Sequence, residues 1–172
     1  KTLSKGNQQK VQLIATLIHE PQLIILDEPF SGLDPVNAEL LKEGILSLKK
    51  QGSCVIFSSH NMEHVEKICD HLVMLNNGKS VLNGVVHEIR ESFGRTKVFL
   101  ESRITRDEIA LLDGVTDVRE REDQTLEITL SNPEVGKEIF RLATADGYIP
   151  MFNQQPPTLE EIFKQKVGEA NV

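Results

Sequence analysis

The sequence is poor in the features that mark several classes of protein. No apolar run approaches the roughly 20 residues of a membrane-spanning helix. Aromatic residues make up only 5%, basic residues form no cluster and the formal net charge is −7, which argues against a nucleic-acid surface. The two cysteines have neither metal nor disulfide spacing. We therefore expect Cys54 and Cys69 to be buried, reduced thiols.

The most informative segment that is present runs from Leu23 to Asp34, LIILDEPFSGLD. Four apolar residues of strand type end in Asp27 and Glu28. Ligands of open α/β sheets bind beyond the carboxyl ends of the strands, so these acids are candidates for a site. Asp27 can hold hydrated Mg²⁺, and Glu28 can orient or deprotonate a water. The alternative is that Asp27 caps a turn and Glu28 is merely solvated.

The start of the chain predicts a helix with a polar N-terminus. LSKGNQQK, from Leu3 to Lys10, opens it, and Glu20-Pro21 ends it. Ser4 and Gly6 then lie where free N–H groups and the helix dipole favour a phosphate, although a plain serine cap is the simpler interpretation. The apolar positions expected to face the core are Val11, Ile14, Ala15 and Ile18.

A second predicted strand, Cys54 to Ser58, also ends in a polar segment. It brings His60 to the same rim of the sheet as Glu28, as a catalytic or a capping residue. The run HNMEH from His60 to His64 fits the H-x-x-E-H pattern of a zinc protease as well. That site needs both histidines inside one helix, whereas His60 is expected at the helix cap.

In combination, these segments resemble the ATP-binding subunit of an ABC transporter over about residues 1–94. LSKGN stands where the family has its LSGGQ signature, and LIILDE matches the Walker B strand. SGLD, from Ser31 to Asp34, matches the D-loop, and SSH, from Ser58 to His60, matches the H-switch.

The resemblance implies ATP and Mg²⁺ as ligands and assigns roles residue by residue. Asp27 would be the Mg²⁺-side carboxylate, Glu28 would act on the lytic water and His60 would contact the γ-phosphate. Asp34 would lie in the interface of a dimer of ATPase subunits. The signature residues would face ATP held by the opposite subunit: Ser4, Lys5, Gly6 and Asn7.

Two features depart from the family. Lys5 and Asn7 replace a glycine and a glutamine of the signature, which the chemistry of a phosphate site tolerates. The phosphate-binding loop GxxxxGK[ST] is absent, because Gly78-Lys79-Ser80 would need its first glycine at Val73 and lies in a predicted hairpin turn. We therefore interpret the chain as the C-terminal part of a larger protein and expect it to be inactive alone.

The order of elements in residues 1–94 predicts an α/β fold. Asp34-Pro35 begins a helix between the two strands, and Gln51-Gly52 ends it. Strand, helix and strand in this order predict adjacent parallel strands. The resemblance makes this module part of a RecA-like P-loop ATPase core. The expected apolar face of the helix carries Ala38, Leu41, Ile45 and Leu48.

Residues 95–172 predict a second, α+β module in the order βαββαβ, a ferredoxin-like unit. Capping boxes at Thr105 to Glu108 and Thr158 to Glu161 begin two of the helices. The expected strands are residues 97–101, 115–119, 125–130 and 148–152, and a helix after Pro133 carries Val135, Ile139 and Leu142 on one face. The module resembles the accessory domain of some bacterial ABC ATPases.

Together, these observations predict an ATP-hydrolysing subunit of an ABC transporter, more in keeping with export than with import. It would work as a homo- or heterodimer with membrane-spanning permease subunits, in the cytoplasm and peripheral to the membrane. The alternatives are an ABC ATPase that acts on ribosomes or DNA, and a non-enzymatic regulatory fragment. The excess of acidic residues lies mainly in residues 95–172, which favours protein contacts over nucleic acid.

The second module generates a first prediction. Its capping boxes and apolar faces predict that residues 95–172 alone are soluble and unfold cooperatively. Because no residue of this segment is assigned to nucleotide, ATP should leave the midpoint unchanged in calorimetry. Gradual, non-cooperative melting would show that the segment depends on the rest of the chain.

Overall fold

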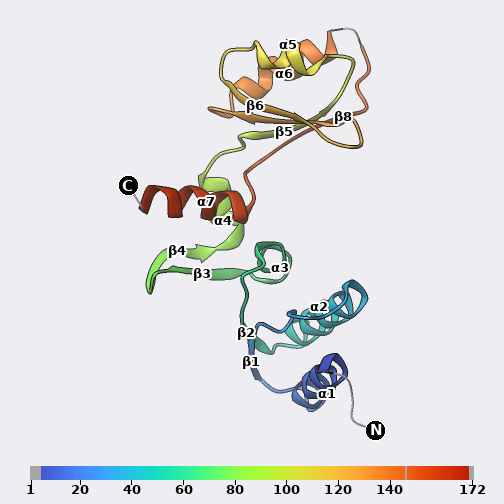
Figure 1. Cartoon of the computed structure of the whole chain (residues 1–172), viewed down its shortest axis with the longest axis vertical. Coiled ribbons are helices and arrows are strands. Elements are labelled where there is room, and N and C mark those ends of the chain that lie inside the picture. The colour runs from blue at the N-terminus through green and yellow to red at the C-terminus, as the bar shows by residue number, and fades with distance from the viewer. Residues whose placement is uncertain (1–4, 146, 171–172) are drawn as a thin grey trace. The chain divides into compact units, whose positions relative to one another are not determined.

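The computed structural model describes residues 5–145 and 147–170 and divides the chain into two compact units, residues 1–69 and 70–172 (Figure 1). This division lies before the predicted module boundary after Gly94, because the predicted hairpin clusters with the residues that follow it. The division of the chain at Gly94 into two domains therefore remains a prediction. Among the described residues, no helix is long and apolar enough to cross a membrane.

The first unit pairs two parallel strands, as the sequence predicts. Strand β1 aligns with β2 from Leu23 opposite Cys54 to Asp27 opposite Ser58. Helix α2 between them begins with Asp34 as its N-cap and proline in its first turn. The elements are α1 (Lys5–Leu17), β1 (Leu23–Asp27), α2 (Pro35–Lys50), β2 (Cys54–Ser58) and α3 (Met62–Ile68).

Within the described residues, only one face of this two-stranded sheet is covered. Its core contains Ile24, Leu26, Phe30, Leu41, Ile45, Leu48 and Ile68. On the other face Leu23, Ile25 and Ile56 are exposed, and in the two strands only Ile24 and Leu26 are buried, so the apolar runs do not form two buried strands. Cys54 lies on that face and is exposed, and Cys69 is half-buried. The predicted apolar face of α1 is exposed as well, at Val11, Ile14 and Ile18.

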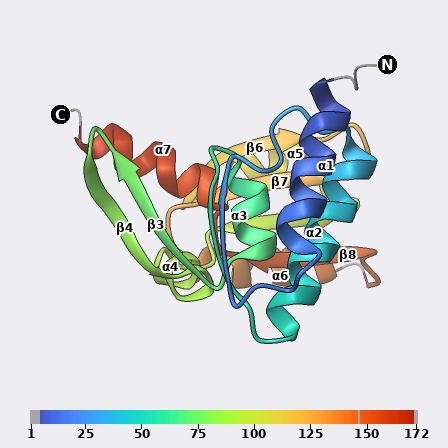
Figure 2. The same cartoon turned by 90° about the horizontal axis from the view of Figure 1, so that it is seen from below.

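The second unit begins with an antiparallel hairpin where the sequence predicts one. Asn77 and Gly78 connect its strands with φ of 48° and 73°, as a type I′ turn requires. In both views α7 lies beside this hairpin (Figure 1 and Figure 2). The elements are β3 (His71–Asn76), β4 (Lys79–Val85), α4 (Val86–Ser92), β5 (Lys97–Glu101), α5 (Arg106–Ala110), β6 (Val115–Glu120), β7 (Leu126–Leu130), α6 (Val135–Thr144), β8 (Met151–Gln155) and α7 (Leu159–Ala170).

Four antiparallel strands form the main sheet of the second unit, in the order β6-β7-β5-β8. With α5 after β5 and α6 after β7, the chain follows the predicted βαββαβ order. Helices α5 and α6 cover one face, where Ile109 and Ile139 pack on the strands. The strand residues of this core are Val98, Leu100, Val118, Leu126, Ile128 and Leu130.

Both predicted capping boxes are present, and two details differ from the sequence prediction. Thr105 and Glu108 exchange hydrogen bonds, as do Thr158 and Glu161. The last strand begins at Met151 rather than at Tyr148, because Pro150 has no N–H for the ladder and pairing starts after it. On α6, Ala143 is buried and Leu142 is 43% exposed, so the buried residues of this helix are Gly136, Ile139 and Ala143.

An ion pair joins β5 to the start of α7. Lys97 Nζ lies 2.6 Å from Glu161 Oε1, 3.6 Å from Glu127 Oε1 and 3.0 Å from Thr129 Oγ1, and the Lys97 side chain is only 14% exposed. Burial by itself would raise the pKa of Glu161. The Lys97 ammonium and the N–H of Thr158 outweigh this effect, so the pKa is lowered from 4.5.

The lowered pKa of Glu161 generates a second prediction. A carboxylate whose pKa is lower in the folded state stabilises the fold above its unfolded pKa, and this contribution is lost as the pH falls through the folded pKa. Stability should therefore fall as the pH drops below 4.5, and Glu161→Gln should make this fall shallower. The measurement is chemical unfolding of the chain at a series of pH values.

The matched control is Glu160→Gln. Its carboxylate pairs with Lys164 at the surface, 2.6 Å away, and is 62% exposed. Exposed pairs contribute little, so this variant should keep the pH dependence of the wild type. An equal change in both variants would contradict the role given to the Lys97 pair.

Candidate functional site

The two acids at the end of β1 are held by the neighbouring strand. Because Asp27 lies opposite Ser58 in the parallel register, the Ser58 hydroxyl reaches both acidic residues. It donates to Asp27 Oδ1 and accepts the Glu28 N–H at 3.0 Å. Asp27 is exposed, so its carboxylate is open to a ligand at the strand end.

Glu28 in turn holds His60. Glu28 Oε1 accepts the His60 N–H at 3.1 Å and lies 2.8 Å from His60 Nδ1. A carboxylate only accepts, so Nδ1 carries the hydrogen in this contact. The His60 side chain is 82% exposed, which leaves its other ring nitrogen accessible. The structure thus brings together three predicted site residues: Asp27, Glu28 and His60.

The turn after the two acids is anchored by Phe30. This side chain is buried, lies edge-on to Phe57 at 6.0 Å between ring centroids and packs on the His64 ring at 4.2 Å. Phe57 comes from β2 and His64 from α3, so three segments meet at one aromatic cluster. The cluster fixes where the chain leaves β1, and with it the direction of Glu28.

Helix α3 begins after His60, which decides against the zinc-protease interpretation. Asn61 is the N-cap, and its side chain accepts the N–H groups of Glu63 and His64. His60 therefore lies outside the helix, and Asn61 is the cap in place of the expected His60. His64 packs on Phe30, and the described residues contain no group of three or more metal-binding side chains.

Asp34 lies at the start of α2, outside the cluster at the strand ends. It accepts hydrogen bonds from the N–H and the side-chain amide of Asn37. These bonds, together with the Lys10 ammonium 3.9 Å away, hold its pKa below the ordinary value. Asp34 therefore links α1 to α2 as a charged group.

The described part of the signature segment forms the first turn of α1. This helix begins at Lys5, so Lys5, Gly6 and Asn7 lie at its N-terminal end. Ser4 lies outside the described residues. The helix end has the polarity that favours an anion.

The donor set at the strand ends fits magnesium better than a transition metal. Mg²⁺ prefers oxygen ligands and usually takes one or two carboxylates, with water and substrate phosphates completing its shell. Asp27 offers one exposed carboxylate of this kind. The oxygen chemistry is therefore compatible with Mg²⁺ that arrives together with a nucleotide.

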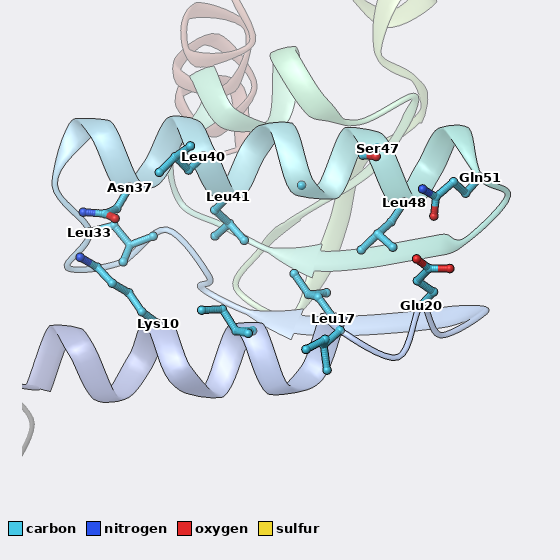
Figure 3. A pocket seen from close by; sticks show the side chains of 13 residues that line it. Lys10, Leu17, Glu20, Leu33, Asn37, Leu40, Leu41, Ser47, Leu48 and Gln51 are labelled. Atoms are coloured by element: carbon cyan, nitrogen blue, oxygen red, sulfur yellow. The ribbon is translucent and has the colours of Figure 1, made fainter.

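A groove of about 490 Å³ lies between α1 and α2, and the sequence did not predict it (Figure 3). Its apolar walls come from both helices, with Lys10 at one end and Glu20 and Gln51 at the other. The helical spacing of Ile14 and Ile18 predicts that they face the core. The sequence therefore does not indicate that they line an open groove. The apolar lining residues are Ile14, Leu17, Ile18, Leu33, Leu40, Leu41 and Leu48.

Two site residues were missed at the sequence level. Ser58 was named as the end of a strand and the first residue of the SSH segment, without a role of its own, although its position opposite Asp27 follows once the register of the strands is known. Phe30 had no assigned role, although an aromatic residue directly after the acidic pair is a candidate anchor. Both depend on contacts between segments about 30 residues apart.

Comparison with known proteins gives matches over both parts of the chain. Residues 84–167 match the family model described as "ATP-binding protein DrrA1-3-like, C-terminal domain". Residues 1–66 match the model described as "AAA domain, putative AbiEii toxin, Type IV TA system". A solved "Structure of ATP binding subunit of ABC transporter" is 39% identical, with a TM-score of 0.50 over 54% of this chain and 38% of the other.

Two curated relatives align over nearly the whole chain. An uncharacterized ABC transporter ATP-binding protein of Alkalihalophilus pseudofirmus is 46% identical over 98% of this chain. The Nod factor export ATP-binding protein I of Rhizobium etli is 33% identical over 96% of it. The chain spans 62% and 52% of the length of these relatives, respectively.

Proposed function

Because the chain belongs to the ATP-binding proteins of ABC transporters, we propose that it forms part of a subunit that couples ATP hydrolysis to transport. The family resemblance drawn from the sequence is thereby confirmed. The observation that carries the proposed hydrolysis is the contact of Glu28 with His60 beside Asp27, at the ends of two parallel strands.

The residues of this cluster would share the work of hydrolysis. Asp27 would hold Mg²⁺, whose positive charge stabilises the charge that develops on the phosphates. Glu28 has one carboxylate oxygen bonded to His60, which leaves the other to orient and deprotonate a water. A His60 ring that carries hydrogen on both nitrogens would donate to Glu28 through Nδ1 and to the γ-phosphate through Nε2.

The first turn of α1 would serve a second nucleotide. In the proposed dimer, the signature residues face ATP held by the opposite subunit, with the N–H groups of the helix end directed at its γ-phosphate. Asp34 would lie in the dimer interface and connect the two sites. The ion pair of Asp34 with Lys10 supports this role, because Lys10 lies on α1, the helix that begins with the signature residues. The signature residues so assigned are Ser4, Lys5, Gly6 and Asn7.

We infer export as the direction of transport. The match to a DrrA1-3-like C-terminal domain and the similarity to a Nod factor export protein favour it. The working assembly would be a homo- or heterodimer bound to permease subunits, cytoplasmic and peripheral to the membrane. Residues 95–172 would contact these protein partners and no nucleic acid.

Two other functions remain outcomes of the tests. A non-transport ABC ATPase is compatible with the match of residues 1–66 to an AAA domain model. A regulatory role without catalysis is compatible with the absent phosphate-binding loop. For the same reason, we propose that this chain by itself is inactive and that hydrolysis needs the loop supplied by a longer protein.

The role of Glu28 generates a third prediction, for the protein that carries this chain together with a phosphate-binding loop. Glu28→Gln should slow ATP hydrolysis by about 10²–10⁴-fold, because a general base contributes about that much. ATP binding should remain intact, since the amide keeps the shape and contacts of the side chain. Phosphate release and equilibrium binding of ATP are the two measurements.

The matched control for Glu28→Gln is Glu43→Gln, the same chemical change at an exposed position of α2. It should hydrolyse ATP at the wild-type rate. Wild-type turnover in Glu28→Gln itself would remove Glu28 from the proposed role and favour a function without hydrolysis.

His60 generates a fourth prediction. His60→Ala should depress turnover by more than it weakens ATP binding, because the ring is proposed to act on the γ-phosphate and on Glu28. His87→Ala removes an exposed imidazole in α4 and should leave turnover unchanged. Steady-state kcat and KM for ATP separate the two effects. An unchanged kcat in His60→Ala would remove His60 from the proposed role and leave it as a residue that only connects β2 to α3.

A further inference from the structure

Ser58 makes contacts that the proposed function does not yet use. Its hydroxyl donates to Asp27 Oδ1 and accepts the N–H of Glu28 at 3.0 Å. A serine hydroxyl has one hydrogen to donate and two lone pairs. One group on β2 therefore bonds to both consecutive acids at the end of β1, to the side chain of the first and to the backbone of the second.

The backbone at Glu28 explains why such a bond matters. Glu28 has φ of 43°, in the left-handed region that residues with a Cβ rarely adopt. A residue keeps this conformation only where its surroundings over-determine it. Here the Glu28 N–H is held by Ser58, and the Glu28 carboxylate by the N–H and ring of His60. Both restraints come from residues 58–60, the last residue of β2 and the two that follow it.

We propose that Ser58 is a positioning residue that sets Asp27 and Glu28 for hydrolysis through one hydroxyl. The proposal rests on the proposed function, because it gives Ser58 a role only through these acids. Ser58 holds one carboxylate oxygen of Asp27 and leaves the other for a ligand. It also holds the backbone of Glu28 in the conformation that directs its carboxylate to His60.

The exposure of Ser58 shows that its side chain does more than pack at the end of a strand. Ser58 is exposed, so its side chain fills no core cavity. Its loss should therefore affect the orientation of the acids much more than the stability of the unit. A hydrogen bond that involves a charged group contributes about 1.5–3 kcal/mol, which corresponds to roughly a ten- to hundredfold change in rate if it acts at the transition state.

The test compares three substitutions in the protein that carries this chain and a phosphate-binding loop. Ser58→Ala removes the hydroxyl, Ser58→Thr keeps it, and Ser58→Val has the shape of threonine without it. We expect kcat to fall about ten- to hundredfold in the alanine and valine variants. KM for ATP should stay within about threefold, and threonine should restore kcat to within about threefold.

A second readout uses the 172-residue chain itself and needs no activity. Amide hydrogen exchange at Glu28, followed by NMR, should be about tenfold faster or more in the alanine and valine variants than in wild type and threonine, because the N–H loses its acceptor. Ser53→Ala, just before the same strand, removes a hydroxyl that bonds to neither acid and should change neither measurement.

The outcomes distinguish a failure of the role given to Ser58 from a failure of the proposed function. Slow hydrolysis by Glu28→Gln with wild-type kcat in Ser58→Ala and Ser58→Val would overturn the role of Ser58 and keep the proposed function. A threonine variant as slow as alanine would also overturn it, because the hydroxyl alone would then not be responsible. Normal hydrolysis by Glu28→Gln would overturn the proposed function and the role of Ser58 with it.

Discussion

In a pair of parallel strands the two carboxyl ends meet at the same edge, and in this chain that constraint places Asp27 opposite Ser58. The rest of the candidate site follows from it. The residue after Asp27 can reach the segment after Ser58, which brings Glu28 to His60. Helix α2 makes the parallel register possible, because it carries the chain back to the start of the second strand. A shift of one residue would turn the acids away from the serine.

Features encoded within a few residues could be predicted from the sequence. Asp34 and Pro35 start α2, two capping boxes begin later helices, and Asn77-Gly78 forms a hairpin turn. Each depends on the chemistry of one short segment. Features that depend on what covers a surface were predicted less well. The apolar run that contains Leu23 and Ile25 and the helical spacing of Ile14 and Ile18 are typical of core positions, and these side chains are exposed.

The same distinction applies to the candidate site. Asp27, Glu28 and His60 could be named as site residues because each lies at or just after the end of a predicted strand. The contact of Glu28 with His60 agrees with this placement. Three features could not be predicted: the left-handed backbone of Glu28, the two hydrogen bonds of the Ser58 hydroxyl and the packing of Phe30 on His64. They require the register of two strands and the path of the turn, which are set by contacts between distant segments.

The uncovered face of the β1–β2 sheet has a consequence for solution behaviour. Leu23, Ile25 and Ile56 lie on that face with exposed fractions of 55%, 69% and 55%. Neighbouring exposed apolar side chains favour association, and association of folded chains shifts the folding equilibrium by mass action. If chains associate through this face, the midpoint of thermal unfolding depends on the protein concentration. Comparisons between variants carry meaning only when the protein concentration is the same.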